Sequence, residues 1–360
     1  SKQSTPIIQR QKNCRRTRKN KMNTNKTLIT GGLGFIGSNY VDYILETKPQ
    51  ENLLVLDKMT YAADPNALKR WEDNKQLTFI QGDICDADLL QKIFKENNIQ
   101  GVVHFAAESH VDNSISRPQA FVETNIMGTF YLLEAARKTW LNERQTLKSD
   151  YKKARFHHIS TDEVYGALGP TGAFSEETAY APNSPYSASK AASDHLVRSY
   201  FHTYSLPVVT TNCSNNFGPY QHSEKLIPTI IRKAIQEEPI PIYGTGENIR
   251  DWLFVQDHCS AIQRVFEKGT LGEVYAVGGD SEKTNLDLCK EVLEILDKHK
   301  PRPNGTSYSE LITHVTDRLG HDYRYAIDAT KIKTTLGWSA QTSFEDALEI
   351  TVFHYLNQGK

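Results

Sequence analysis

Cysteine is scarce in this sequence, and no two cysteines have the spacing of a metal-binding or redox pair. The 360 residues contain five cysteines and no C-x-x-C pair: Cys14, Cys85, Cys213, Cys259 and Cys289. An odd, dispersed set argues against a disulfide framework and against a structural zinc site. We therefore expect reduced, inert thiols in a cytoplasmic protein, and no metal centre.

Long apolar runs are also missing. No stretch of about 18 apolar residues occurs, so we expect no transmembrane helix and no membrane partner. Residues 1–25 lack the apolar core of a secretory signal. The length and the 38% of hydrophobic residues are sufficient for a large core, in one large or two coupled domains.

The chain has almost no net charge, with a formal value of −1. Nine of its 42 Lys and Arg residues lie in residues 1–26, which contain no Asp or Glu, so the remainder is acidic. This balance is typical of a soluble enzyme, and we expect no nucleic-acid partner. We predict that residues 1–25 form a disordered basic tail outside the fold. The alternatives for this tail are an anchor for nucleic acid or an acidic partner, and a transit peptide.

Strand-like and helix-like segments alternate through the first part of the chain. Apolar runs typical of buried strands occupy residues 27–30, 53–56, 77–80, 101–105, 155–160 and 208–210. Helical patterns occupy residues 35–45, 88–96, 120–139 and 187–204. This alternation predicts an α/β fold with a doubly wound parallel sheet.

The pattern changes after about residue 212, where Pro and Gly become frequent and the helices become shorter. We predict a first domain over residues 26–211. Residues 212–360 are expected to form mainly a smaller α/β substrate-binding domain, with segments that return to the first.

A glycine-rich segment follows the first strand-like run. Gly31, Gly34 and Gly37 have the spacing G-x-x-G-x-x-G and open a helical pattern. Glycine permits a tight turn, close approach of the backbone to a pyrophosphate and close packing of helix on sheet. Asp57 ends the second strand-like run twenty residues past Gly37. A carboxylate there hydrogen-bonds the ribose 2′-hydroxyl and favours NAD over NADP, although the neighbouring Lys58 weakens that preference.

The predicted NAD-binding residues lie mostly after successive strands. They are Gly31, Gly34, Phe35, Ile36, Gly37, Asp57, Lys58, Thr60, Asp83, Ile84, Ala106, Ala107, Ser109, Thr124, Tyr186 and Lys190.

Tyr186 and Lys190 are four residues apart at the start of a helical pattern, so they share one face. Tyrosine, with a pKa of about 10, is a poor base at neutral pH. A nearby lysine and the positive charge of a nicotinamide both favour the phenolate. The phenolate can then take the proton of a sugar hydroxyl while a hydride leaves its carbon.

Together with the glycine motif and Ser160-Thr161, this pair resembles the extended short-chain dehydrogenase/reductase superfamily. More narrowly, the chain resembles the dTDP-glucose 4,6-dehydratases, enzymes of deoxysugar biosynthesis, from about Lys26 almost to its end. The motifs that carry this resemblance occupy residues 161–166, 106–112, 212–219, 249–252 and 317–322. The resemblance implies a Rossmann-type sheet, NAD as cofactor and a homodimer. Leu319 stands where the family usually has Pro, which is expected to affect loop rigidity more than chemistry.

Two adjacent acids distinguish a dehydratase from relatives that only oxidise and reduce C4. By resemblance, Thr161 binds the C4 oxygen, Glu163 removes the C5 proton, and Asp162, kept protonated, donates a proton to the departing C6 hydroxyl. The two carboxyl groups must therefore have pKa values pushed apart. The implied product is a 4-keto-6-deoxy sugar.

The nucleotide sugar requires cations and amide donors. The predicted substrate-binding residues, several of them assigned by resemblance, are Ser109, Thr161, Asn215, Lys225, Leu226, Pro241, Tyr243, Arg250, Asn285, Arg318 and His321. By resemblance, the neighbouring Asn216 binds the NAD cofactor.

Other functions stay open at this point. UDP-glucose is the alternative substrate, because a single methyl group on the base is worth only about 1–3 kcal/mol. A nucleotide-sugar 4-epimerase and a decarboxylase are the alternative enzymes, but neither requires Asp162 as a leaving-group acid. A catalytically silent NAD-sensing or scaffold protein is the alternative of another class, and it would be expected to lack Tyr186, Lys190 or the acid pair.

Overall fold

The computed structural model describes residues 24–358. Its main sheet has seven parallel strands in the order β10-β6-β5-β4-β1-β2-β3. The strands are β1 (Lys26–Thr30), β2 (Leu53–Asp57), β3 (Leu77–Gln81), β4 (Ile99–His104), β5 (Arg155–Thr161), β6 (Val208–Cys213) and β10 (Val274–Val277). The predicted tail lies almost wholly outside the described residues.

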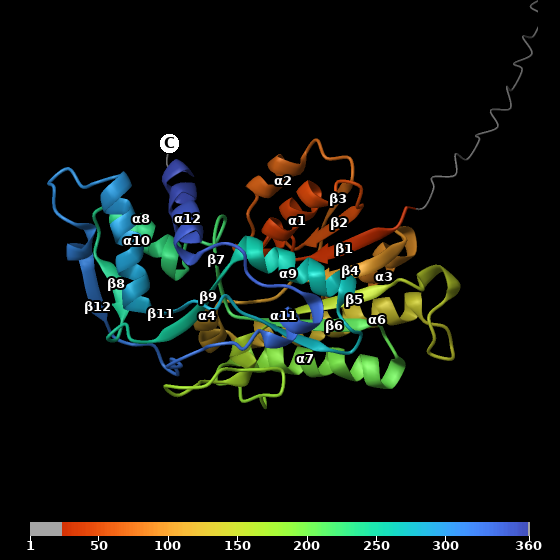
Figure 1. The fold of residues 1–360 in the computed structure, drawn as a ribbon. Coiled ribbons are helices and arrows are strands. Elements are labelled where there is room, and N and C mark those ends of the chain that lie inside the picture. The colour runs from red at the N-terminus through yellow and green to blue at the C-terminus, as the bar shows by residue number, and fades with distance from the viewer. Residues whose placement is uncertain (1–23, 359–360) are drawn as a thin grey trace, which may run out of the picture.

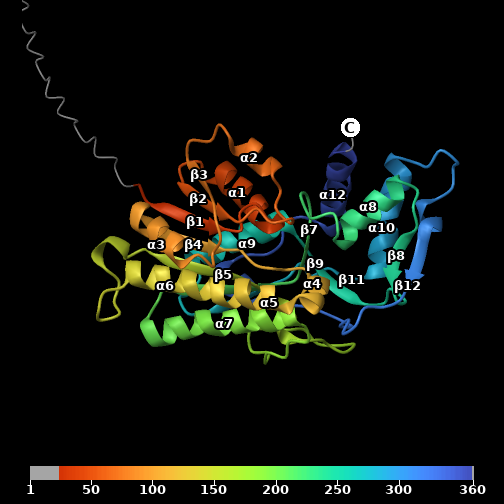
Figure 2. The same ribbon diagram turned by 180° about the vertical axis from the view of Figure 1, so that it is seen from behind.

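Helices cover both faces of this sheet, as Figures 1 and 2 show. One layer consists of α3 (Ala87–Glu96), α6 (Thr129–Trp140) and α7 (Pro185–Tyr204), and the other consists of α1 (Phe35–Thr47), α9 (Val255–Lys268) and α11 (Thr330–Leu336). Alternation along β1 explains the two layers, because Leu28 packs against the first and Ile29 against the second. The predicted doubly wound parallel sheet is confirmed.

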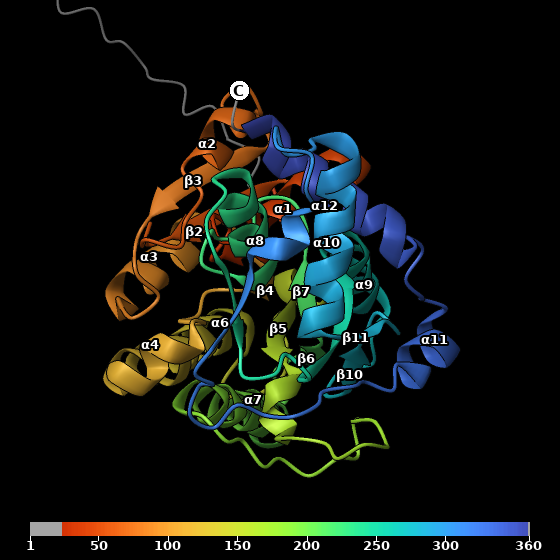
Figure 3. The ribbon, with the colours of Figure 1, turned by 90° about the vertical axis from the view of Figure 1, so that its left-hand side faces the viewer.

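The remaining elements lie mainly beyond the carboxyl edge of the sheet (Figure 3). A three-stranded sheet contains β7 (Asn215–Phe217), β9 (Ile249–Phe254) and β11 (Glu282–Thr284), and a two-stranded sheet pairs β8 (Ile240–Tyr243) with β12 (Ile312–Val315). The helices here are α8 (Leu226–Ile235), α10 (Asn285–His299) and α12 (Phe344–Gln358). Short helices α2 (Asn66–Trp71), α4 (Val111–Ser116) and α5 (Pro118–Phe121) occur earlier in the chain. The described residues also form three 3₁₀ turns, η2 (Ser149–Tyr151), η3 (Asp162–Tyr165) and η4 (Tyr308–Leu311).

The helix expected over residues 120–139 differs from the prediction. It consists of α5, a π-helical segment η1 (Val122–Gly128) and α6. Asn125 in η1 is buried, and its amide donates to the Glu108 carbonyl and the Ser189 hydroxyl. A π-helical turn widens a helix locally and is common at functional sites. Here it accompanies an inward-facing Asn125 between α7 and the loop after β4.

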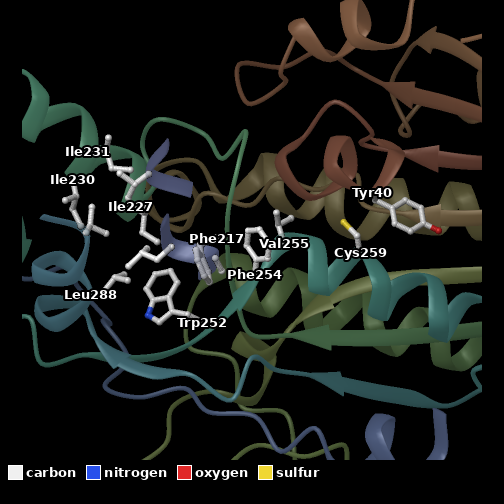
Figure 4. Packing of buried hydrophobic residues seen from close by; sticks show 14 of the residues in the cluster. Tyr40, Phe217, Ile227, Ile230, Ile231, Trp252, Phe254, Val255, Cys259 and Leu288 are labelled. Carbon is white, nitrogen blue, oxygen red and sulfur yellow. The ribbon is translucent and has the colours of Figure 1, made fainter. Parts of the chain in front are cut away.

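A continuous hydrophobic core joins the main sheet to the C-terminal elements. Tyr40 of α1 and Val255 of α9 belong to the same cluster as Phe217, Trp252 and Leu288 (Figure 4). Because one core serves both parts, the elements beyond the sheet edge are held rigidly against it. We retain residues 26–211 and 212–360 as a proposed division into domains.

Gly37 illustrates how tightly α1 is packed on the turn after β1. An added Cβ atom at Gly37 would collide with the carbonyl oxygen of Gly31, which belongs to the backbone and cannot move aside easily. Gly37→Ala is therefore expected to lower the free energy of unfolding by about 1–3 kcal/mol. Urea unfolding followed by tryptophan fluorescence measures this change. Gly169→Ala is the matched control, because an added Cβ there meets nothing within 4 Å, and equal losses in the two variants would contradict the explanation.

Candidate active site

A cavity of about 560 Å³ opens at the carboxyl edge of the parallel sheet, between the sheet and the C-terminal elements. Every residue predicted to bind cofactor, to bind substrate or to carry chemistry lines this one cavity. The structure thus brings together segments from β1 to the loop before α11. Their individual roles stay proposals.

The turn after β1 and the start of α1 lie on the wall of the cavity. Gly31 has a φ of 70°, and its added Cβ would lie 2.6 Å from the Ala106 backbone nitrogen. Helix α1 begins directly after Gly34, without a side-chain cap and without an acidic residue in its first turn. The first N–H groups of α1 are therefore available to an anion such as a pyrophosphate.

Asp57 lies at the end of β2, on the cavity wall. Its carboxylate accepts hydrogen bonds from the backbone N–H groups of Leu33 at 2.9 Å and Met59 at 2.7 Å. Burial raises the pKa of Asp57, and these two hydrogen bonds oppose the rise. The side chain is thereby fixed at the position where a ribose is expected.

Lys58 does not neutralise Asp57 in this structure. Its ammonium lies 2.7 Å from the carboxylate of Asp83, and this ion pair lowers the pKa of Asp83 against the opposing effect of burial. Because Lys58 is paired with Asp83, it weakens the preference of Asp57 for a free ribose 2′-hydroxyl less than the sequence suggests. Most other residues predicted to contact the cofactor follow a strand of the main sheet: Thr60 follows β2, Ile84 follows β3, and Ala106, Ala107 and Ser109 follow β4. Thr124 lies in η1.

Tyr186 and Lys190 lie in the first turns of α7, which begins with a capping box formed by Ser184 and Ser187. The effect of Lys190 on the Tyr186 phenolate stays a prediction. The Lys190 ammonium donates to the Ile159 carbonyl at 2.8 Å. The pKa of Tyr186 is raised, mainly by burial and then by the negative charge of Glu163, whereas a hydrogen bond with Thr161 opposes the rise.

The two adjacent acids form the first residues of η3, directly after β5. Thr161 caps this turn, because its hydroxyl oxygen accepts from the Glu163 N–H at 3.2 Å. The capped turn directs both carboxyl groups to the cavity wall beside Tyr186. Asp162 is 1% exposed, whereas Glu163 is half-buried.

The environments of the two acids differ in charge. Burial and the neighbouring carboxylates of Glu163 and Asp251 raise the pKa of Asp162 well above its ordinary value. Burial also raises the pKa of Glu163, but Arg250 and Lys225 oppose that rise. One oxygen of Asp162, Oδ2, is buried without a hydrogen-bond partner among the described residues. A protonated carboxyl fits such a position better than a carboxylate does.

Arg250 and Lys225 bring positive charge into the cavity from the C-terminal elements. Arg250 in β9 is 7% exposed, and it donates to the Ile249 carbonyl at 2.8 Å and the Asp322 carbonyl at 3.1 Å. Its guanidinium also lies 4.3 Å from the ring centroid of Tyr325. Lys225 directly precedes α8. Burial lowers the pKa of Lys225, and the charge of Glu163 opposes this effect.

The other predicted substrate residues surround the far end of the cavity. Arg318 lies 3.5 Å from Asp112 and 5.0 Å from the ring centroid of Tyr243. His321 contacts Asp317 at 2.6 Å. Leu226 begins α8, Pro241 lies in β8, Asn285 begins α10 and Asn215 belongs to β7, next to the predicted cofactor residue Asn216. Asn216 is held by His258, whose Nδ1 lies 2.8 Å from the amide oxygen.

The sequence reasoning missed several residues that close the cavity. His110 and His222 lie 3.5 and 3.7 Å from the Glu224 carboxylate, and the ring of His222 packs edge-on against Tyr61. Asp322 and Tyr325, which are hydrogen-bonded to each other, also line it. His110 and Asp322 stood inside the quoted motifs, which were the available signal. No comparable signal pointed to Tyr61, His222 or Tyr325.

Comparison with known proteins identifies the family. The protein family described as GDP-mannose 4,6 dehydratase matches residues 28–351. The dTDP-glucose 4,6-dehydratase of Xanthomonas campestris pv. campestris (strain B100) is 53% identical over 330 residues, which cover 91% of this chain and 92% of that protein.

Solved structures extend this agreement to the fold. A crystal structure of dTDP-glucose 4,6-dehydratase from Bacillus anthracis in complex with NAD has a TM-score of 0.81 and 43% identity, and the match covers 93% of this chain and 97% of that one. DesIV, the dTDP-glucose 4,6-dehydratase of Streptomyces venezuelae, was solved with NAD bound. It has a TM-score of 0.83 and 40% identity over the same shares of the two chains. The chain described here therefore belongs to the GDP-mannose 4,6 dehydratase family and, within it, to the dTDP-glucose 4,6-dehydratases.

Proposed function

We propose that this protein catalyses the NAD-dependent conversion of dTDP-glucose into a 4-keto-6-deoxy sugar by loss of water. The single observation that carries the proposal is the pair Asp162 and Glu163, held by Thr161 beside Tyr186 in a cavity with dinucleotide-binding features. The activity of a 4-epimerase or a decarboxylase would not use Asp162, whose buried Oδ2 has no hydrogen-bond partner among the described residues. A catalytically silent NAD-sensing protein would use neither the two acids nor Tyr186.

The cavity fits NAD. The uncapped start of α1 suits the pyrophosphate, and Asp57 suits the adenosine ribose. An added Cβ at Gly34 would meet only the Gly31 carbonyl at 3.3 Å, so the backbone here is open to close approach. When bound, NAD accepts a hydride from C4 of the sugar and returns it to C6.

Tyr186 is the base of the first step. A positive charge in the cavity beside the phenol lowers its pKa, which burial otherwise raises. The phenolate then takes the proton of the C4 hydroxyl as the C4 ketone forms. Thr161, whose hydroxyl caps the turn η3 and which lines the cavity with Tyr186, is placed to orient the C4 oxygen.

Asp162 and Glu163 perform the elimination. The ketone at C4 acidifies the C5 proton, which Glu163 removes, because Arg250 and Lys225 favour its carboxylate. Asp162, protonated through burial and like charge, gives its proton to the C6 hydroxyl, which leaves as water. After C6 is reduced, the proton held by Glu163 returns to C5.

Glu163→Gln is expected to reduce dehydration by about 10²- to 10⁴-fold, because the amide cannot take the C5 proton. Oxidation at C4 should continue, since Tyr186 and Lys190 are unchanged. The 4-keto-6-deoxy product is measured by its absorbance in alkali, and reduced cofactor by its near-ultraviolet absorbance. Glu177→Gln, at an exposed position nearby in the chain, serves as the control. Full dehydration by the Glu163 variant would show that Glu163 is not the base that removes the C5 proton.

Asp57→Asn tests the cofactor preference. The change preserves the shape of the side chain but removes the charge that repels a 2′-phosphate, so the preference for NAD over NADP should fall by about 10- to 100-fold. The ratio of kcat/KM values with the two cofactors measures this. Asp73→Asn, at an exposed position after α2, should leave the ratio unchanged. An unchanged ratio in the Asp57 variant would place the ribose elsewhere.

We further propose a cytoplasmic homodimer. Ile115 of α4 is 46% exposed, and Val122 and Met127 of η1 are 49% and 38% exposed. Burying such a group of apolar side chains against a second copy is favourable. Sedimentation equilibrium should give the mass of two chains, and Val122→Glu should shift the distribution toward one chain. A monomeric parent protein would refute the dimer.

The free thiols of Cys85, Cys213, Cys259 and Cys289 support a reducing compartment.

A further inference from the structure

Asp194 is a buried acid that the reaction described above does not use. It lies in α7, one helical turn after Lys190, and is 5% exposed. A buried carboxylate is costly unless it is paired and hydrogen-bonded. The groups around Asp194 therefore show which interactions stabilise its charge.

Four donors converge on the Asp194 carboxylate. Oδ1 lies 2.9 Å from Nε2 of His158. Oδ2 accepts from the Ser160 hydroxyl at 2.9 Å, the Tyr180 hydroxyl at 2.9 Å and the Asn212 amide at 3.1 Å. These partners come from β5, from the loop before α7 and from β6. Such a set of donors holds the group as a carboxylate in one orientation.

The same network holds the end of β5 against α7. The Asn212 amide that donates to Asp194 also donates to the Thr161 carbonyl at 3.0 Å. Ser160 donates to Asp194 directly, and Lys190 donates to the carbonyl of Ile159. Ile159 and Ser160 are thus bound directly to the helix that carries Tyr186, and Thr161 is bound to it through Asn212.

Asp194 and Lys190 lie four residues apart in α7 and both are buried, so their opposite charges attract each other with little screening by water. The titratable groups that face the pair from neighbouring elements are His104 of β4, His158 of β5, Tyr165 of η3, Tyr180 of the following loop and Cys213 of β6. Burial lowers the pKa of both histidines and raises the pKa of Tyr165, Tyr180 and Cys213, so all five groups are uncharged near neutral pH. Burial likewise lowers the pKa of Lys190, and Asp194 is the main opposing influence.

We propose that Asp194 is a positioning residue that keeps the Lys190 ammonium charged and holds Thr161 at a fixed distance from Tyr186. This inference rests on the proposed function for its catalytic consequence, but the pairing of the two charges is independent of any substrate. It assigns a role to a residue that does not line the cavity.

A double-mutant cycle without substrate tests the pairing. Asp194→Asn leaves a buried ammonium without its anion, Lys190→Met leaves a buried carboxylate without its cation, and the double variant contains neither. The decrease in the urea midpoint of the double variant should therefore be smaller than the sum of the two single decreases. Additive decreases would overturn the pairing. If the single variant Asp194→Asn does not fold, the pairing predicts that the double variant still folds. A double variant that is also unfolded would overturn the pairing.

Tyr180→Phe is the matched control for this cycle. It removes one donor to Asp194 but no charge. Its effect on the urea midpoint should add to that of Lys190→Met. A non-additive result of the same size as in the Asp194 cycle would mean that packing, and not charge, couples these positions.

The pH profile of kcat tests the catalytic consequence. Removing the anion lowers the pKa of Lys190, so activity that needs the ammonium is lost at a lower pH. Asp194→Asn should therefore move the alkaline limb of the profile down by about one pH unit or more, with little change in KM. Tyr180→Phe should leave the limb in place. An unmoved limb in Asp194→Asn overturns the catalytic consequence. If the parent protein is inactive on dTDP-glucose, the proposed function is wrong, but the unfolding cycle still tests the pairing of Asp194 with Lys190.

Discussion

The burial of charge at the carboxyl edge of the sheet is the constraint on which this site depends. Asp162, Lys190, Asp194 and Arg250 are each 7% exposed or less. Charged groups withdrawn from water need partners with good geometry, or they shift to the neutral form. Arg250 and Asp194 have such partners, whereas the carboxylates of Glu163 and Asp251 near Asp162 outweigh the opposing charge of Arg250. The site therefore holds ionised and protonated groups side by side, as a proton-transfer enzyme requires.

Those partners come from distant parts of the chain, so the site forms only when the whole fold is complete. Asp194 joins α7 to β5 and β6, and Arg250 binds the carbonyl groups of a loop more than 70 residues later. The shared hydrophobic core places the C-terminal elements firmly against the sheet. As a result, the cations beside Glu163 occupy fixed positions, and fixed charges need no reorganisation when a proton moves.

The sequence was sufficient for the residues whose spacing is imposed by local geometry. The turn at Gly31, the acid at Asp57 and the pair at Tyr186 and Lys190 follow from one turn or one helix face, and all of them line the cavity. Groups defined only by tertiary packing were not predictable. Asp194 occurs in a helical pattern where an acid is most often solvated, and only burial distinguishes it. The raised pKa of Tyr186 has the same origin, because spacing showed the helpful lysine but neither the desolvation nor the opposing carboxylates.

The asymmetry between Asp162 and Glu163 explains why adjacent residues of nearly the same chemistry can perform opposite tasks. In an extended chain both would ionise at a similar pH. The capped turn η3 places Asp162 inward, beside Asp251, and leaves Glu163 within reach of the charges on Arg250 and Lys225. The C-terminal elements thus supply the difference that the local sequence lacks. A relative that retained Thr161, Tyr186 and Lys190 but lost this electrostatic asymmetry would keep the redox step at C4 and lose the elimination.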